Sequence, residues 1–117
     1  MVFTLIICTY KRSQPLLKLL LSVQHQTLYP NGILIVDGSP DDFTKEMLTQ
    51  NSFENLKYFK VDETDRGLTK QRNYGIARVQ EASEVVCFLD DDTVLEPTYF
   101  EEIIKTYTLF PEALGVG

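Results

Sequence analysis

The sequence lacks the segments that would place it in or across a membrane. No apolar stretch approaches about 18 residues, the minimum expected of a membrane-spanning helix, so no span is predicted. There is no low-complexity tract and no internal repeat. The start, MVFTLIICTYKR, has no basic segment ahead of its apolar run and is therefore not a secretory signal peptide. We expect a cytoplasmic protein, with peripheral association at a membrane surface as a second option.

Cysteine and positive charge are both scarce. The two cysteines, Cys8 and Cys87, lie in apolar runs, which predicts buried free thiols in a reducing compartment rather than a disulfide. The chain has 11 Lys and Arg residues and 17 Asp and Glu residues, which gives a formal net charge of −6. Nucleic acid binding needs a basic surface, so nucleic acid is not the expected partner. A small phosphorylated ligand remains compatible, because it needs only a few local cations or a metal ion.

What is present is an alternation of strand and helix patterns within a length, 117 residues, that suits a single domain covering residues 1–117. Short β-branched apolar runs predict strands, and apolar residues at helical spacing predict helices. We expect Ser13 to cap the first helix, and Leu68, Ile76 and Val79 to pack the third. The predicted strands are residues 2–8, 33–36, 56–61 and 84–89, and the helices are residues 13–26, 42–49, 68–80 and 97–109; residues 113–117 begin another strand.

This β-α-β-α-β-α-β-α order predicts an α/β fold, a Rossmann-like parallel sheet with helices on both faces. In the usual strand order, 3-2-1-4, the order reverses between the first and fourth strands, and the third strand is at an edge. Ligands of such sheets bind beyond the carboxyl ends of the strands at that reversal. The site should therefore be lined by TYKR, DGSPDD and DDDT, which follow the first, second and fourth strands.

Three consecutive aspartates, Asp90, Asp91 and Asp92, follow the fourth predicted strand. Two like charges about 4 Å apart repel by about 4 kcal/mol at an effective dielectric constant of 20, so the cluster favours a cation. Mg²⁺ and Mn²⁺ take carboxylate ligands and often bridge to phosphates. Asp90 and Asp92 form a D-x-D pair that can face one ion, or one ion and a ribose. The alternative is that these carboxylates cap a turn and are otherwise solvated.

The first two segments add an aromatic ring, cations and an acid. Tyr10 can stack on a base, and Lys11 or Arg12 can meet a phosphate. Asp37 can accept a hydrogen bond from a base, or it can begin an Asx turn with the following GSP. A solvated basic turn is the alternative for the two cations.

The segment RGLTKQRNYG, before and within the third predicted helix, supplies further candidates. Gly67 permits a close approach of the backbone to a ligand. Lys70 and Arg72 would lie near the start of a helix, where anions are favoured. Basic residues on a helix can equally form a solvated surface.

Taken in order, LIICTYKR, ILIVDGSPDD, RGLTKQRNYG and VVCFLDDDTVLEP resemble the family 2 glycosyltransferases, nucleotide-sugar enzymes of the GT-A fold. The resemblance covers residues 3–117. It implies that the chain is the N-terminal half of a GT-A fold, which binds a nucleotide-diphosphate sugar, a UDP-sugar by preference. The sugar would pass, with inversion, to a hydroxyl of a glycan or lipid acceptor. Many members have VDDGS where this chain has VDGSP, which leaves Asp37 as the only acid at that point.

The resemblance also assigns roles to residues. Asp37 is implied to pair with the base, close to Thr9 and Tyr10, and Asp92 to hold Mn²⁺ or Mg²⁺ on the diphosphate. Together with the candidates above, the expected nucleotide-binding residues are Thr9, Tyr10, Arg12, Asp37, Lys70, Arg72, Asp90 and Asp91. The expected metal ligands are Asp92 and Asp90.

No catalytic residue is expected in this chain. Transfer to a hydroxyl needs a general base, which the resemblance places well downstream of the D-x-D motif. Glu96, Glu101 and Glu102 lie too close to that motif. We therefore expect a domain truncated at its C-terminus that binds a nucleotide sugar weakly without turning it over. An uncovered edge beside the fourth strand would favour a homo-oligomer.

Two other interpretations stay open. FLDDDTVL fits the aspartate-nucleophile phosphohydrolases of the haloacid dehalogenase type, with Asp90 as nucleophile and Asp92 as acid/base. That motif normally follows the first strand of its domain, however, and here three predicted strands precede it. The second alternative is a non-catalytic nucleotide-binding module. A calcium EF-hand is excluded because Leu95 stands where glycine is needed and Val94 has no ligand oxygen.

Overall fold

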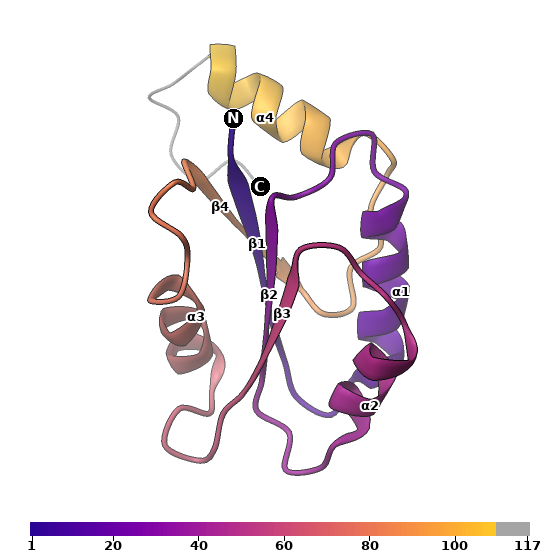
Figure 1. The fold of residues 1–117 in the computed structure, drawn as a ribbon, viewed down its shortest axis with the longest axis vertical. Helices are drawn as coiled ribbons and strands as arrows, with labels where there is room; N and C mark the ends of the chain where they lie inside the picture. The colour runs from indigo at the N-terminus through magenta and orange to yellow at the C-terminus, as the bar shows by residue number, and fades with distance from the viewer. Residues whose placement is uncertain (110–117) are drawn as a thin grey trace.

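The computed structural model describes residues 1–109 and shows a four-stranded parallel sheet in the order β3-β2-β1-β4 (Figure 1). The predicted strand order and the edge position of the third strand are both confirmed. The strand expected at residues 113–117 lies outside the described residues. Along the chain the elements are β1 (Phe3–Thr9), α1 (Ser13–Gln24), β2 (Gly32–Asp37), α2 (Phe43–Gln50), β3 (Leu56–Lys60), α3 (Leu68–Ile76), β4 (Val85–Asp90) and α4 (Tyr99–Leu109).

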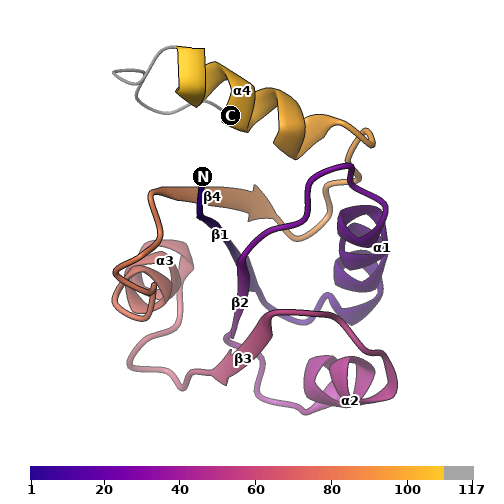
Figure 2. The ribbon, with the colours of Figure 1, turned by 45° about the horizontal axis from the view of Figure 1, so that its top comes forward.

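Helices cover both faces of the sheet, as predicted, with α3 on one face and α1 and α2 on the other (Figure 2). The central strand β1 serves both cores because successive side chains point to opposite faces. Phe3, Leu5 and Ile7 are fully buried in the core shared with α1, and the Phe3 ring lies 5.3 Å from that of Phe100 in α4. Ile6 is equally buried in the smaller core under α3. Burial on both faces explains the almost continuous apolar sequence of β1.

The helix α3 differs from its prediction in length and in packing face. It ends at Ile76 instead of residue 80. Directly after Ile76 the chain forms a turn, in which the amide of Arg78 donates a hydrogen bond to the Gly75 carbonyl. Leu68 and Ile76 are 54% and 49% exposed, so the expectation that they pack was wrong. Gln71 and Gly75 face the sheet instead.

Glycine is required at residue 75 by close packing. A Cβ atom there would lie 2.8 Å from Ile6 Cγ2, closer than real Cβ contacts allow. The missing side chain lets α3 approach β1 and fixes which face of the helix meets the sheet. Val79, which was predicted to pack, does pack against this core, from the turn that follows the helix.

The starts of α1 and α4 depart from the predictions. Ser13 is the first residue of α1 instead of its cap, and Arg12 occupies the cap position without a side-chain hydrogen bond. Helix α4 begins at Tyr99, slightly later than expected. At α2, the Asp41 carboxylate accepts the amide of Phe43 at 3.2 Å.

Three observations bear on the wider predictions. No helix within residues 1–109 combines the length and the apolar character needed to cross a bilayer. Cys8 and Cys87 are both free thiols, as predicted, but only Cys87 is buried, whereas Cys8 is half-buried. Within the same residues β4 pairs with β1 alone, so self-association through its outer edge stays a prediction.

Candidate functional site

The ends of three strands bring the predicted segments to one edge of the sheet. Thr9 ends β1, Asp37 ends β2 and Asp90 ends β4. In the parallel register Thr9 pairs with Asp37, and Cys8 pairs with Asp90. The loops TYKR, DGSPDD and DDDT therefore leave the sheet side by side, at the reversal of strand order where ligands bind in such sheets.

A hydrogen bond joins the loops on the two sides of this reversal. Thr9 is 3% exposed, and its Oγ1 donates to Asp91 Oδ2 over 2.9 Å. Arg12 Nη1 lies 3.5 Å from Asp91 Oδ1 and 3.4 Å from Asp92 Oδ2. Two carboxylates thus converge on one positive charge. Asp91 is the inward-facing member of the three aspartates, since Asp90 and Asp92 are exposed.

The inward position of Asp91 affects its ionisation. Burial raises the pKa of its carboxyl above the ordinary value, and the charges of Asp92 and Asp90 add to the rise. The Thr9 hydrogen bond and the Arg12 charge act in the opposite direction on the same pKa. The hydroxyl of Thr9 and the charge of Arg12 therefore favour the ionised form of Asp91 against the effect of burial.

Asp37 is fully buried and makes two hydrogen bonds within the protein. Its Oδ1 accepts the amide of Ser39 at 2.9 Å, and its Oδ2 accepts the hydroxyl of Tyr58 at 2.7 Å. The first bond is the Asx turn that the sequence allowed. Burial, together with the bond to Asp37, raises the pKa of Tyr58. Both carboxylate oxygens of Asp37 are therefore already engaged by protein donors.

Gln71 is a structural centre of the site that the sequence analysis missed. Its buried amide nitrogen donates to the carbonyls of Thr9 at 3.2 Å and Val36 at 2.9 Å. Its oxygen accepts the amide of Gly67 at 3.1 Å. One side chain thus ties the ends of β1 and β2 to the start of α3. The signal in the sequence was its position four residues before Gly75, on the same face of the helix.

An open pocket of about 370 Å³ lies beside Asp91. Four predicted nucleotide-binding residues line it, namely Thr9, Tyr10, Arg12 and Asp91. Gly67 also lines it, with φ at +118° and nothing within 4 Å of where a Cβ would stand. The other lining residues are Cys8, Arg66, Leu68 and Gln71.

The remaining predicted residues do not line this pocket. Lys70 is exposed on α3, and the guanidinium of Arg72 lies 5.3 Å from the ring of Phe88, towards β4. Asp37 is fully buried at the end of β2, whereas Asp90 and Asp92 are exposed beside Asp91.

Arg66 supplies the pocket with a cation that the sequence analysis did not select. Its Nε donates to the Gly38 carbonyl at 2.7 Å, and its Cζ lies 5.6 Å from the centre of the Tyr10 ring. A Cβ on Gly38 would come within 3.2 Å of Arg66 Cγ, so the glycine leaves room for the arginine stem. The feature of the sequence that could have identified Arg66 is its position directly before Gly67, in the segment already selected as a candidate.

The carboxylates suit a hard divalent cation. Asp91 and Asp92 already turn oxygens toward one positive charge, that of Arg12. Residues 1–109 contain no group of three or more His, Cys, Asp or Glu side chains placed to hold a metal ion. Mg²⁺ is commonly bound through one or two carboxylates, with waters and substrate phosphates completing its coordination. The donor set fits that kind of site.

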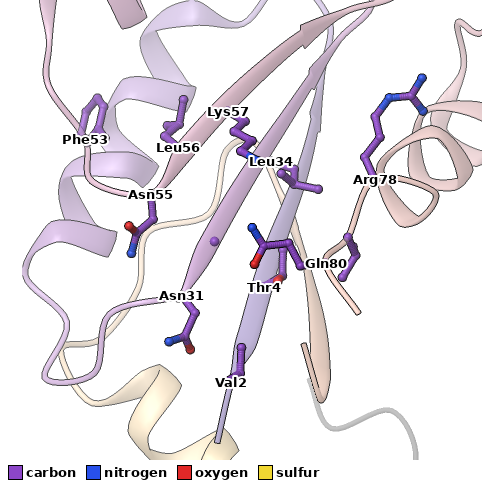
Figure 3. A pocket seen from close by; sticks show the side chains of 12 residues that line it. Val2, Thr4, Asn31, Leu34, Phe53, Asn55, Leu56, Lys57, Arg78 and Gln80 are labelled. Atoms are coloured by element: carbon purple, nitrogen blue, oxygen red, sulfur yellow. The ribbon is translucent and has the colours of Figure 1, made fainter. Parts of the chain in front are cut away.

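A second pocket, of about 250 Å³, lies at the opposite end of the strands (Figure 3). It is lined near the starts of the strands by Thr4, Gly32 and Leu56, and on the side of α3 by Arg78 and other residues. None of the predicted site residues lines it.

Comparison with known proteins identifies the family. The model of glycosyl transferase family 2 matches residues 4–113. The chain is 28% identical over 119 residues to the glucosyl-dolichyl phosphate glucuronosyltransferase of Haloferax volcanii. That alignment covers 97% of this chain and 36% of the relative. It is 30% identical over 95 residues to the O-antigen chain rhamnosyltransferase RfbN of Salmonella typhimurium, covering 81% of this chain and 29% of that protein.

Solved structures agree on the fold. S. aureus TarS 1–349, in complex with UDP-GlcNAc, superposes with a TM-score of 0.80 at 21% identity, over 100% of this chain and 37% of that one. The predicted GT-A type of α/β fold is confirmed. The chain spans about a third of the length of the curated relatives it matches. It belongs to glycosyl transferase family 2.

Proposed function

We propose that this domain binds the nucleoside diphosphate of a UDP-sugar together with Mn²⁺ or Mg²⁺, as the donor-binding part of a glycosyltransferase. The observation that carries the proposal is the Thr9–Asp91 hydrogen bond across the strand reversal, beside the open pocket. It fixes a carboxylate at the place where parallel sheets bind ligands. Further support comes from the relatives, whose names describe sugar transferases, and from TarS, whose structure is a complex with UDP-GlcNAc.

In this proposal the diphosphate lies at the carboxylate end and the base stacks on Tyr10, which is 45% exposed. Asp91 and Asp92, with Asp90 beside them, would hold the ion. The bound ion supplies positive charge that offsets the charges of the carboxylates and the diphosphate. Arg12, released from its two carboxylates, is then free to pair with a phosphate.

The acceptor side of the reaction is also proposed by analogy with the family. The sugar would be transferred with inversion to a hydroxyl of a glycan or lipid, by a cytoplasmic enzyme or one associated with a membrane surface. Of the acids at the site, Asp37 is buried and bonded, and Asp91 is held by Thr9 and Arg12. Asp90 and Asp92 are the exposed carboxylates that this proposal assigns, with Asp91, to the ion. We therefore propose that the general base lies outside residues 1–109 and that this chain alone binds the donor without transferring its sugar.

Titration calorimetry of UDP with and without Mn²⁺ tests the proposal. We expect Mn²⁺ to tighten UDP binding by about ten-fold or more, equivalent to about 1.4 kcal/mol. Asp92→Ala should abolish that gain. Asp42→Ala is the matched control, because it removes the same charge from an exposed carboxylate that pairs with Lys60 and does not line the pocket.

Two results would argue against the proposal. Failure of the unmodified chain to bind UDP in the presence of Mn²⁺ would remove its basis. Hydrolysis of p-nitrophenyl phosphate that depends on Asp90 would favour the phosphohydrolase interpretation. A transfer assay with a radiolabelled donor decides whether the chain by itself is catalytic or only a binding module.

A further inference from the structure

We propose that Arg66 is a specificity-determining residue, which selects a base that presents a carbonyl oxygen at the far end of the pocket, as uracil does, over cytosine, which presents an amino group there. The inference rests on the proposed function. It assigns a base-reading role to the cation that lies next to Tyr10 in the pocket.

The order of the strands places Arg66 at the end of the pocket opposite the carboxylates. Asp91 follows β4, on one side of β1, whereas Arg66 is bonded to Gly38, which follows β2 on the other side. Two strand spacings, about 10 Å, separate β4 from β2. A nucleotide whose diphosphate lies by Asp91 therefore directs its base toward Arg66. The base is attached to ribose through N1, so the atom on position 4 lies farthest from the diphosphate.

The guanidinium of Arg66 is held in place but keeps donors available. Its Nε is used by the Gly38 carbonyl at 2.7 Å. Its two terminal nitrogens have no hydrogen-bond acceptor in the part of the chain that the structure describes. The group is planar, always charged and offers donors only. It therefore matches the O4 carbonyl of uracil and opposes the amino group of cytosine at the same position.

Other polar groups near this end are already committed to the protein. The amide nitrogen of Gln71 is used by two backbone carbonyls. Asp37 is fully buried, and both of its carboxylate oxygens accept protein hydrogen bonds. Arg12 faces the carboxylates at the other end. Arg66 is thus the pocket-lining side chain best placed to discriminate between bases.

Calorimetry with UDP and CDP, each with Mn²⁺, tests the role. We expect the unmodified chain to prefer UDP by about ten-fold, since a hydrogen bond from a charged donor to O4, set against an unpaired amino group in CDP, supplies discrimination of that order. Arg66→Ala should weaken UDP binding by about ten-fold and bring the two affinities within about two-fold of each other. Arg66→Lys should retain part of the UDP affinity and part of the preference, because the ammonium group also carries a charge and offers donors only. Arg66→Gln should lose the preference, because its amide offers both a donor and an acceptor.

Arg78→Ala is the matched control. Arg78 also lies over an aromatic ring, that of Tyr74 at 3.3 Å, but it lines the other pocket. This variant should keep both the UDP affinity and the preference. Circular dichroism melting of each variant checks that it is folded.

The two proposals fail in different ways. A UDP preference that survives unchanged in folded Arg66→Ala and Arg66→Gln overturns the role of Arg66 and leaves the proposed function standing. Equal affinities of the unmodified chain for UDP and CDP also overturn it. An unmodified chain that binds neither nucleotide overturns the proposed function, and the inference with it.

Discussion

Thr9 ends β1 and Asp91 directly follows the neighbouring parallel strand β4, and the Thr9 hydroxyl donates a hydrogen bond of 2.9 Å to the Asp91 carboxylate. The bond links the loop after β1 to the loop after β4. It holds Asp91 inward, in the pocket wall, next to the guanidinium of Arg12.

Thr9→Val should therefore weaken binding of UDP with Mn²⁺ by about five- to ten-fold and cost about 1 kcal/mol of folding free energy, the usual net value of one hydrogen bond. The side chain keeps its shape while Asp91 loses its donor. Calorimetry and urea unfolding measure the two effects. Thr4→Val is the matched control, because the Thr4 hydroxyl bonds Ser83 at 2.9 Å at the other end of the sheet. Equal UDP affinities for the two variants would contradict the role of the Thr9 bond.

Arg12→Gln should change two affinities in opposite directions. Arg12 neutralises the carboxylates of Asp91 and Asp92 in the absence of a ligand, so its removal should tighten Mn²⁺ binding by about three-fold, a modest effect because exposed ion pairs are weak. The same change should weaken binding of UDP with Mn²⁺, because a phosphate partner is lost. Electron paramagnetic resonance of free Mn²⁺ measures the first effect and calorimetry the second. Parallel loss of both affinities would count against the proposed exchange of partners.

Alkylation of Cys8 should depend strongly on pH. Burial raises the pKa of its thiol to about 11, although the charge of Arg72 opposes the rise. The thiolate fraction at pH 8 is then about a hundred-fold lower than for a free cysteine, and only the thiolate reacts. Labelling by iodoacetamide should rise steadily between pH 8 and pH 11. Because the neutral thiol is favoured in the folded state, stability should fall as the pH rises from about 9 to about 11.

Ligand binding should separate the two cysteines. Cys8 lines the pocket and Cys87 does not, although burial raises the pKa of Cys87 to about 11 as well. UDP with Mn²⁺ should slow labelling of Cys8, measured by mass spectrometry of the tryptic peptides, and should leave Cys87 unchanged. Equal protection of both thiols would indicate a general loss of opening motions instead of direct cover by the nucleotide.

Gly75→Ala should destabilise the domain by about 1–3 kcal/mol, the usual cost of overpacking a core. The added Cβ would lie 2.8 Å from Ile6 Cγ2. Without that contact, Ala would stabilise a helix relative to Gly by about 0.5–1 kcal/mol. A lower free energy of unfolding for Gly75→Ala therefore indicates the close contact, and a higher one indicates its absence. Gly32→Ala is the control, because its new Cβ would meet Thr4 at an ordinary 3.5 Å. A stabilised Gly75→Ala variant would show that α3 is free to move away from the sheet.

The order of the elements and the position of the site could be predicted because both follow from periodicity and topology. Apolar runs of strand length alternate with helical patterns, and the strand order 3-2-1-4 brings Thr9, Asp37 and Asp90 to one edge. The Asx turn at Asp37 was one of the two roles that the sequence allowed, since Gly38 and Ser39 follow it. Each of these predictions needs only local sequence and the rules of parallel sheets.

The choice among the basic residues near α3 could not be predicted, because it depends on how the helix is rotated. Gln71 and Gly75 face the sheet, which turns Arg72 toward Phe88 and leaves Lys70 in solvent. That rotation is set by the contact of Gly75 with Ile6, a packing effect that hydrophobic periodicity does not reveal. The position of Arg66 likewise depends on its bond to Gly38, a residue far away in the sequence.

The pairing of β1 with both of its neighbours limits where this domain can be lengthened. One extra residue within β1 would move each later side chain of this strand to the opposite face of the sheet, because successive residues of a strand point to opposite sides. Ile7 would then point toward the core of Ile6, and Thr9 would no longer stand opposite Asp37. Engineered insertions, such as a peptide tag, belong instead in the exposed turn at Glu81 and Ala82, away from the carboxyl ends of the strands.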